Sequence, residues 1–324
     1  MRLKKNTKII SVLLSLVLLL CGCAGISPVN KEKAVLATGG TAGTYFAVGS
    51  AMSTVLNPVL KRSELSVLST GGSRANIALL DSRDASFAIV QNDVLYYAYT
   101  ATDLFDGDTA HEKLRGLACL YEETLQIVTC DESIKTVTDL KGKNVCVGDE
   151  GSGVEVNARQ ILEAYGMTFE DINVVNAPFE EAAQSLKKGE IDAAFIIAGA
   201  PTKAVTDLSK DTKIRLVALD DEHISSLKSK YRFYGETILS AGTYSGFDED
   251  VTTVSVKAVL TASERMPKEE VYELLSAFFE KNELLSSSHK GLNGLTPKEA
   301  SEGISVPMHK GAEKYYKEQG IVLK

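Results

Sequence analysis

The sequence predicts an α/β protein of two lobes, each built on a mostly parallel sheet. Short apolar runs alternate with helical patterns from Ala34 onward, which is typical of βαβ units. The alternation restarts later, where Asp192–Ile197 repeats the Asp-Ala-x-Phe-x-Ile pattern of Asp84–Ile89; chance similarity of apolar strands is the alternative. Two extended runs, 125–130 and 252–261, flank one intact set of elements. They suit a chain that crosses to a second lobe and returns, leaving a cleft between.

Periodicity and turn residues place the elements of both lobes. Proline is favourable in the first turn of a helix, so a helix is expected to start at Pro201. Met266-Pro267 breaks the pattern before one long amphipathic helix. The expected strands are Ala34–Thr38, Leu65–Ser69, Ser86–Val90, Asn144–Gly148 and Ala193–Ile197. The expected helices are Tyr45–Leu60, Ser73–Leu80, an aromatic helix through Leu95–Tyr99, Val154–Tyr165 and Glu269–Leu285. Lobe 1 is predicted as 34–126 and 259–324, and lobe 2 as 127–258.

The N-terminus predicts export and a lipid anchor. Basic residues precede a short apolar run, Ile9–Leu20, which resembles a signal peptide more than a membrane span of ~20 residues. Leu20-Cys-Gly-Cys23 then resembles a bacterial lipobox. We expect residues 1–22 as a lipoprotein signal peptide, lipidation at Cys23 and a tether over 23–33; an uncleaved anchor or plain secretion is the alternative. Cleavage would take the net charge from −8 to −12.

Composition and cysteine use narrow the class further. An acidic chain of 324 residues with a pI of about 5.2 argues against nucleic acid as the main partner. Cys119, Cys130 and Cys146 lie among apolar neighbours and without a C-x-x-C pair, as buried small hydrophobic residues do. A disulfide between Cys119 and Cys130 stays open for an exported protein.

Five junctions between a strand and the following helix carry glycines and hydroxyls. In open α/β sheets, ligands sit beyond the carboxyl ends of strands, where helix N-termini offer free N–H groups. This chemistry suits a small anion or zwitterion, with Asp93 or the Gln91 amide available for an ammonium group. Each junction alone could be an ordinary turn with its cap. The junctions are Thr38–Thr44, Thr70–Ser73, Gln91–Asp93, Asp149–Gly153 and Ala198–Pro201.

Nucleotide, metal and catalytic motifs are not found. Thr41 stands where a dinucleotide motif has its second glycine, and Thr70 stands where an acid would hold a ribose. The four histidines show no metal-ligand spacing, and no nucleophile elbow occurs. The adjacent pairs Glu122-Glu123 and Glu180-Glu181 do not face one site, so both are interpreted as solvated or capping. No cofactor or metal is therefore predicted.

The chain resembles the TAXI branch of the solute-binding proteins that serve tripartite ATP-independent periplasmic (TRAP) transporters. The resemblance covers nearly the whole mature chain. Val154 and Arg74 depart from the family pattern; Arg74 would either pair with a carboxylate or be a solvated helix residue. The stretches that carry the resemblance are Ala37–Tyr45, Thr70–Asn76, Ala88–Asp93, Leu140–Val145, Gly148–Gly153, Gly189–Phe195, Ala198–Pro201, Ile238–Tyr244 and Pro307–Tyr316.

The resemblance implies a two-lobed periplasmic-binding-protein fold of type II that closes on its ligand. It also implies delivery of a small carboxylate or an amino acid such as glutamate to a sodium-coupled permease. The ligand carboxylate would meet the first two loops, Gln91 and Asp93 its polar end, and lobe 2 would close over it. The expected ligand-binding residues are Thr41, Thr44, Tyr45, Thr70, Gly71, Ser73, Gln91, Asp93, Ser152, Gly153 and Gly199.

The sequence therefore predicts an extracytoplasmic, lipid-anchored solute receptor that is not an enzyme. Its partners would be a small carboxylate or amino-acid ligand, TRAP permease subunits and, through the lipid, the membrane. Two alternatives stay open: a ligand-sensing module for a membrane kinase, and an exported α/β enzyme that uses the same cleft. An enzyme would need a nucleophile–base pair, which the sequence does not show.

Overall fold

The computed structural model describes residues 31–287 and 290–323. The predicted signal peptide, the lipidation site at Cys23 and most of the tether lie outside these residues. Along the described chain, no helix is both long enough and apolar enough to cross a bilayer.

One mixed sheet runs through the molecule in the order β2-β1-β3-β10-β4-β7-β5-β6, with β8 paired to β4 and β9 to β10. The strands β1–β3 pair in parallel, as do β5–β7, whereas β4 and β10 are antiparallel to their neighbours. The strands are β1 (Glu32–Ala37), β2 (Ser63–Leu68), β3 (Phe87–Gln91), β4 (Leu114–Thr129), β5 (Asn144–Cys146), β6 (Asn173–Val175), β7 (Ala193–Ala198), β8 (Arg215–Val217), β9 (Gly235–Leu239) and β10 (Val251–Ser263).

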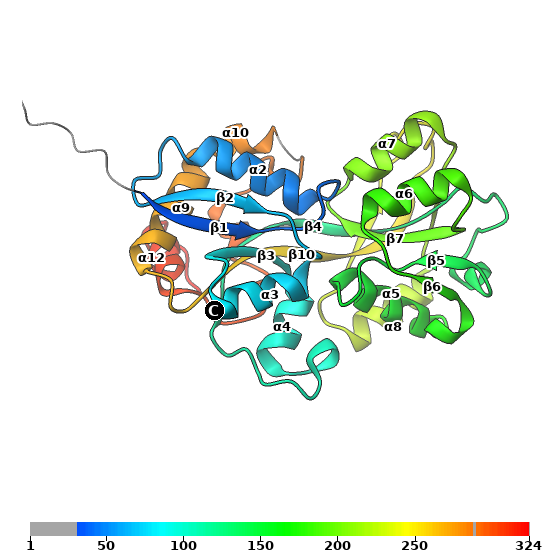
Figure 1. Ribbon diagram of the computed structural model, residues 1–324, viewed down its shortest axis with the longest axis horizontal. Coiled ribbons are helices and arrows are strands. Elements are labelled where there is room, and N and C mark those ends of the chain that lie inside the picture. Colours follow the sequence, from blue (N-terminus) through cyan, green and yellow to red (C-terminus); the bar gives the residue numbers. More distant parts are fainter. Residues whose placement is uncertain (1–30, 288–289, 324) are drawn as a thin grey trace, which may run out of the picture.

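The helices cover both faces of the sheet in each half of the molecule (Figure 1). In the first half, α2 and α9 lie on one face and α3 and α4 on the other; in the second half, α6 and α7 oppose α5 and α8. The helices are α2 (Thr44–Leu56), α3 (Ser73–Ser82), α4 (Asn92–Thr100), α5 (Gly153–Ala164), α6 (Phe179–Lys188), α7 (Lys203–Asp211), α8 (Asp221–Lys230), α9 (Lys268–Glu280), α10 (Asn282–Ser286), α11 (Pro297–Ala300) and α12 (Lys310–Glu318).

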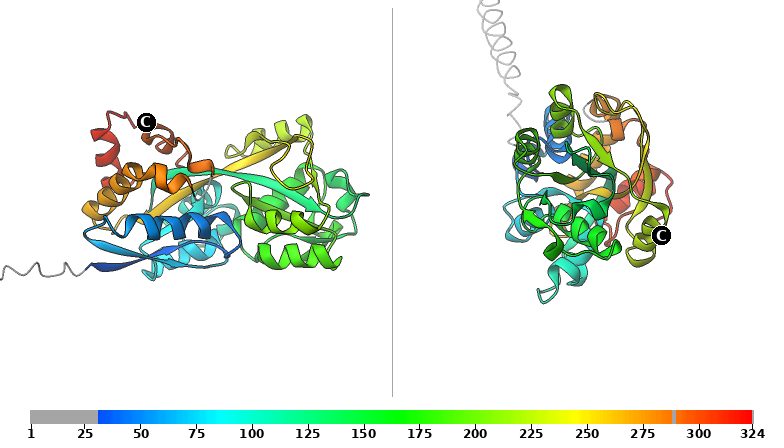
Figure 2. Two further views of the ribbon diagram at one scale, coloured as in Figure 1. Left: turned by 90° about the horizontal axis from the view of Figure 1, so that it is seen from above. Right: turned by 90° about the vertical axis from the view of Figure 1, so that its right-hand side faces the viewer.

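Two long strands join the halves. Residues 258–262 of β10 pair with β3, whereas 251–255 pair with β9. Strand β4 likewise pairs with β10 as far as Thr124 and with β7 from there to Thr129. Figure 2 shows both strands passing from one half to the other. The strand partners change near residues 126/127 and 258/259, where the sequence analysis placed the lobe boundaries. The division into lobes at these residues stays a prediction.

The C-terminal helices pack into the first half. Phe278 of α9 and Tyr316 of α12 are fully buried in one apolar cluster with Leu36 and Phe87. The Tyr316 hydroxyl donates to the carbonyl oxygen of Leu117 at 2.9 Å, so the buried phenol keeps a partner. The C-terminal helices α9 and α12 thereby pack in the same half of the molecule as β1 and β3.

Three predicted helix limits are wrong for local reasons. The first helix ends at Leu56 rather than Leu60. The side-chain amide of Asn57 donates to the carbonyl oxygen of Leu65 on β2 and accepts from the Leu65 N–H, which ties the chain to that strand. The helix expected at Pro201 begins at Lys203, after Thr202 as N-cap. The helix expected over Glu269–Leu285 is divided at Lys281 into α9 and α10.

The cysteines are unbridged. Cys119 and Cys146 are buried, as predicted for small hydrophobic residues, and Cys130 is partly exposed. The disulfide left open between Cys119 and Cys130 is therefore not present.

Candidate functional site

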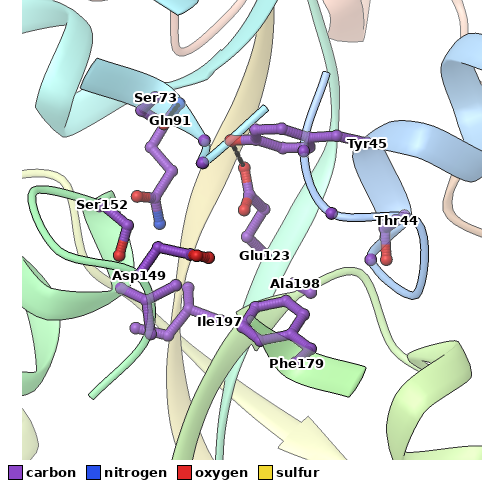
Figure 3. A pocket seen from close by; sticks show the side chains of 17 residues that line it. Thr44, Tyr45, Ser73, Gln91, Glu123, Asp149, Ser152, Phe179, Ile197 and Ala198 are labelled. Atoms are coloured by element: carbon purple, nitrogen blue, oxygen red, sulfur yellow. Dashed lines mark hydrogen bonds between the residues drawn. The ribbon is translucent and has the colours of Figure 1, made fainter. Parts of the chain in front are cut away.

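A cavity of about 60 Å³ lies between the two halves (Figure 3). By this measure one water needs roughly 10–15 Å³, so the space is several waters large. Both halves and the shared strand β4 contribute to its wall. The lining residues are Gly39, Gly40, Gly43, Thr44, Tyr45, Gly71, Gly72, Ser73, Gln91, Glu123, Asp149, Ser152, Gly153, Val154, Phe179, Ile197 and Ala198.

Four helices begin at this wall. Thr44 opens α2, Ser73 opens α3, Gly153 opens α5 and Phe179 opens α6, and all four residues line the cavity. The first turn of a helix has N–H groups without intrahelical partners and the positive end of the helix dipole. The wall therefore attracts an anionic group from two sides, with α2 and α3 in the first half and α5 and α6 in the second.

The halves touch each other around the cavity. The Thr44 hydroxyl donates to the carbonyl oxygen of Gly199 at 2.9 Å, across the cleft. Gly153 packs so closely that an added Cβ would lie 1.3 Å from Oε1 of Gln91. These contacts define a closed arrangement.

Glu123 is the main residue that the sequence analysis misjudged. It is 2% exposed and lines the cavity, whereas its neighbour Glu122 is exposed. The interpretation of this pair as solvated or capping is thus wrong for Glu123, because successive residues of a strand point to opposite faces. The signal was present, since the pair interrupts a run of apolar β-type residues.

The buried carboxyl has one protein partner. The Tyr45 hydroxyl donates to Oε1 of Glu123 at 2.6 Å (Figure 3). Burial raises the pKa of Glu123 well above its usual range, and the bond from Tyr45 offsets only part of that shift. Burial and the neighbouring Glu123 also raise the pKa of Tyr45, which keeps its hydroxyl protonated as the donor.

A second carboxyl faces the cavity from the other half. Asp149 follows β5 and points toward Glu123 in Figure 3. Its partial burial raises its pKa, and Glu181 adds a smaller effect of the same sign. The complete lining is described by the structure, and it includes no lysine, arginine or histidine. The cavity thus combines two acids with helix N-termini.

Asp93 does not line the cavity. It is 1% exposed and accepts a hydrogen bond from the Asn157 amide of the second half at 2.7 Å. Asn157 also donates to the Tyr234 hydroxyl at 2.9 Å and accepts from the Gln91 amide at 3.0 Å. Asp93 therefore belongs to a buried polar contact between the halves, beside the cavity wall.

Three more predicted residues lie next to the cavity rather than on its wall. Thr41 is exposed in an adjoining surface depression. The Thr70 hydroxyl lies 2.8 Å from the Thr38 carbonyl oxygen and accepts from the Gly72 N–H, which holds the turn before α3. Gly199 takes part only through the carbonyl that Thr44 bonds. The remaining predicted residues, Thr44, Tyr45, Gly71, Ser73, Gln91, Ser152 and Gly153, line the cavity.

The two departures from the family pattern take different places. Val154 lines the cavity with its apolar side chain. Arg74 is about half exposed and pairs with Asp108 at 3.2 Å, away from the lining. Arg74 thus pairs with a carboxylate of the protein, outside the cavity lining, and stays half exposed like a solvated helix residue.

The lining offers little for catalysis. Ser152 caps α5 by accepting from the Glu155 N–H, and Ser73 accepts from the Gln91 N–H. Neither serine has a histidine or lysine beside it on the wall. Among the described residues, no group of histidine, cysteine and acidic side chains could hold a metal ion.

The fold and the cleft define a class. The mixed α/β architecture, with a closed cavity between two halves, is the periplasmic-binding-protein fold of type II, as predicted. The chain belongs to the NMT1-like family, whose model matches residues 36–320.

Solved structures share this fold at low identity. A protein from Bordetella bronchiseptica RB50 is 12% identical with a TM-score of 0.57, over 90% of this chain and 99% of that one. A structure described as a periplasmic transporter is 14% identical with a TM-score of 0.55, over 89% and 92%. The periplasmic aliphatic sulphonate binding protein SsuA from Escherichia coli is 15% identical with a TM-score of 0.45, over 80% and 79%.

The contact of Gly153 with Gln91 gives the first testable expectation. Gly153→Ala places a Cβ 1.3 Å from Gln91 Oε1 only when the halves are closed, and the Gly153 backbone is not in the left-handed region. Overpacking of about 1–3 kcal/mol should disfavour closure and lower ligand affinity roughly 5- to 150-fold. Calorimetric titration measures the affinity. Gly235→Ala, whose Cβ would meet its nearest neighbour at 3.5 Å, is the control. Equal affinities for the two variants would contradict a closing cleft.

The Asp93 contact predicts a pH effect on stability. Burial raises the pKa of Asp93 from 3.8 to about 6, against opposing hydrogen bonds from Asn157 and the Val94 N–H. Between these values the unfolded chain has released a proton that the folded chain keeps, so stability falls as pH rises from about 4 to 6. The total loss is roughly 3 kcal/mol.

Asp93→Asn should remove this loss of stability with rising pH. A change in the free energy of unfolding that is the same at every pH does not alter the slope. Urea unfolding at pH 4 to 7 measures the slope, with the exposed Asp106→Asn as control. Parallel profiles for Asp93→Asn and the wild type would show that Asp93 does not titrate in this range.

Proposed function

We propose that this protein is an extracytoplasmic solute-binding protein that captures a small carboxylate or amino acid, of the glutamate type, for a TRAP-type permease. The observation that supports this most is the cavity between the two halves, whose wall includes the first turns of α2, α3, α5 and α6. A wall of this kind can bind a small anionic group without catalysing a reaction on it.

The carboxylate of the ligand would bind at the N-termini of α2 and α3. The loop through Gly39–Thr44 and the turn Gly71–Ser73 bring backbone N–H groups and hydroxyls to the cavity. The Thr70 hydroxyl supports this site from behind by fixing the turn. Backbone donors and helix dipoles together are sufficient to bind a carboxylate.

Ligand binding would favour the closed arrangement. A ligand that touches both α2–α3 and α5–α6 gains contacts only when the halves meet, so it shifts the population toward closure. The contacts of Thr44 with Gly199, and of Gly153 with Gln91, would then form with the ligand in place.

Delivery to a permease rests on the N-terminus and on the TAXI resemblance. A lipid on Cys23 would hold the receptor at the outer face of the cell membrane, with 23–33 as the tether and two lobes divided as predicted from the sequence. Incorporation of labelled palmitate into the wild type but not into Cys23→Ala is expected; equal labelling would remove the anchor from the proposal.

A thermal-shift panel of amino acids and dicarboxylates tests the solute-binding function. A ligand at 100 times its Kd adds about 2.7 kcal/mol to stability, which should raise Tm by roughly 5 °C or more. Native mass spectrometry of freshly purified protein would identify a co-purified metabolite. If no small carboxylate shifts Tm and no metabolite is retained, the function is wrong. Turnover of a bound compound would instead favour an enzyme.

A further inference from the structure

We propose that the ligand carries a cationic amine, that Glu123 is the residue that binds it, and that Asp149 faces the same amine from the second half. This inference rests on the proposed function, and it narrows the ligand from small carboxylates in general to amino acids and related zwitterions. From the sequence, Asp93 or the Gln91 amide is expected to take the ammonium group; Asp93 lies off the cavity wall, whereas Glu123 lines it.

The free oxygen of Glu123 is the first reason. The carboxyl is almost fully buried, yet only Oε1 has a partner, the hydroxyl of Tyr45. No hydrogen bond to Oε2 is formed by any residue that the structure describes. Glu123 lines the cavity, so this oxygen is open to a donor that a bound ligand brings.

Charge balance is the second reason. An ionised carboxylate out of water costs several kcal/mol unless a cation pairs with it. Glu123 and Asp149 both line the cavity, and no cationic side chain lines it with them. Without a ligand, burial raises the pKa of Glu123 and favours its neutral form. An ammonium group would supply the missing positive charge and the missing donors together.

The position of Tyr45 is the third reason. Its hydroxyl holds Oε1 and leaves the other oxygen directed at the cavity (Figure 3). Tyr45 belongs to α2, whose first turn is a proposed carboxylate site. Adjoining parts of one wall would thus bind the two charged groups of a small zwitterion, the carboxylate at the helix N-termini and the amine at Glu123.

Asp93 does not compete for this role. Both of its oxygens already have partners: Oδ1 accepts from the Val94 N–H at 2.8 Å, and Oδ2 accepts from Asn157. The Gln91 amide nitrogen is likewise bonded to Asn157. The Gln91 oxygen also lies at the wall, but an amide is uncharged and cannot balance the charge of an ammonium group. Glu123 offers both an open oxygen and a negative charge when ionised.

The experiment compares matched ligands and matched variants. The standard L-amino acids, together with glutarate, succinate and propionate, are titrated into the wild type by calorimetry. The tightest-binding amino acid is then compared with its counterpart that lacks the amine, such as glutarate for glutamate. We expect the amine to improve affinity roughly 10- to 100-fold, the range of a charge-assisted contact.

Glu123→Gln is the decisive variant. It keeps the side-chain volume and an oxygen for the Tyr45 bond but removes the charge, so the advantage of the amine should fall to about threefold or less. Glu122→Gln, one residue away on the opposite face, should keep the full advantage. The unliganded Tm of Glu123→Gln should equal or exceed that of the wild type, because a buried acid is replaced by a neutral amide. Asp149→Asn should reduce the same advantage without affecting the fold.

The outcomes separate the two proposals. If glutarate, succinate or propionate binds as tightly as its amino counterpart, or if Glu123→Gln keeps the preference for the amine, the inference is overturned and the solute-binding function stands. If no amino acid and no carboxylate binds the wild type, the proposed function falls and the inference falls with it.

Discussion

The antiparallel pairing of β4 with β10 is the constraint on which the rest of the structure depends. These strands are the only elements of the described chain that belong to both halves of the sheet, and they pair from Leu114 with Ser263 to Thr124 with Ser255. Glu123 lies opposite Val256, where the partners of both strands change. The same segment is therefore the floor of the cavity and the connection across which the halves must move. A ligand bound at Glu123 contacts the one place that both halves share.

Hydrogen bonds between the halves stabilise the closed form, and the enclosure of acidic side chains destabilises it. Closure brings Thr44 to Gly199 and Asn157 to Asp93, and each such bond contributes about 1 kcal/mol. It also encloses carboxyls in a cavity without a basic side chain. The burial that raises the pKa of Glu123 and of Asp149 is the cost of that enclosure. A ligand that brings a positive charge to Glu123 and a negative charge to the helix N-termini would remove part of this cost, which explains how a small molecule could decide the position of two large halves.

Much of the fold follows from the sequence, because alternating strands and helices and Gly/Ser/Thr junctions are local signals. The loops that line the cavity were predicted from the same signals, as Thr44, Ser73 and Ser152 show. What could not be predicted depends on contacts between distant residues. Asp93 follows a strand, as a ligand-binding residue would, yet its partner Asn157 lies 64 positions further along the chain. The interpretation of Glu122-Glu123 as solvated or capping missed the buried acid. The expected extended run, 125–130, covers only the last part of β4, which begins at Leu114.

The central claim is that a small zwitterion is held between the halves with its amine on the shared strand. A crystal structure of the protein with its tightest-binding amino acid tests this most directly. We expect the ligand inside the cavity, with its ammonium nitrogen within hydrogen-bond distance of Glu123 Oε2 and its carboxylate at the first turns of α2 and α3. A ligand outside the cavity, or one whose carboxylate faces Glu123, would contradict it.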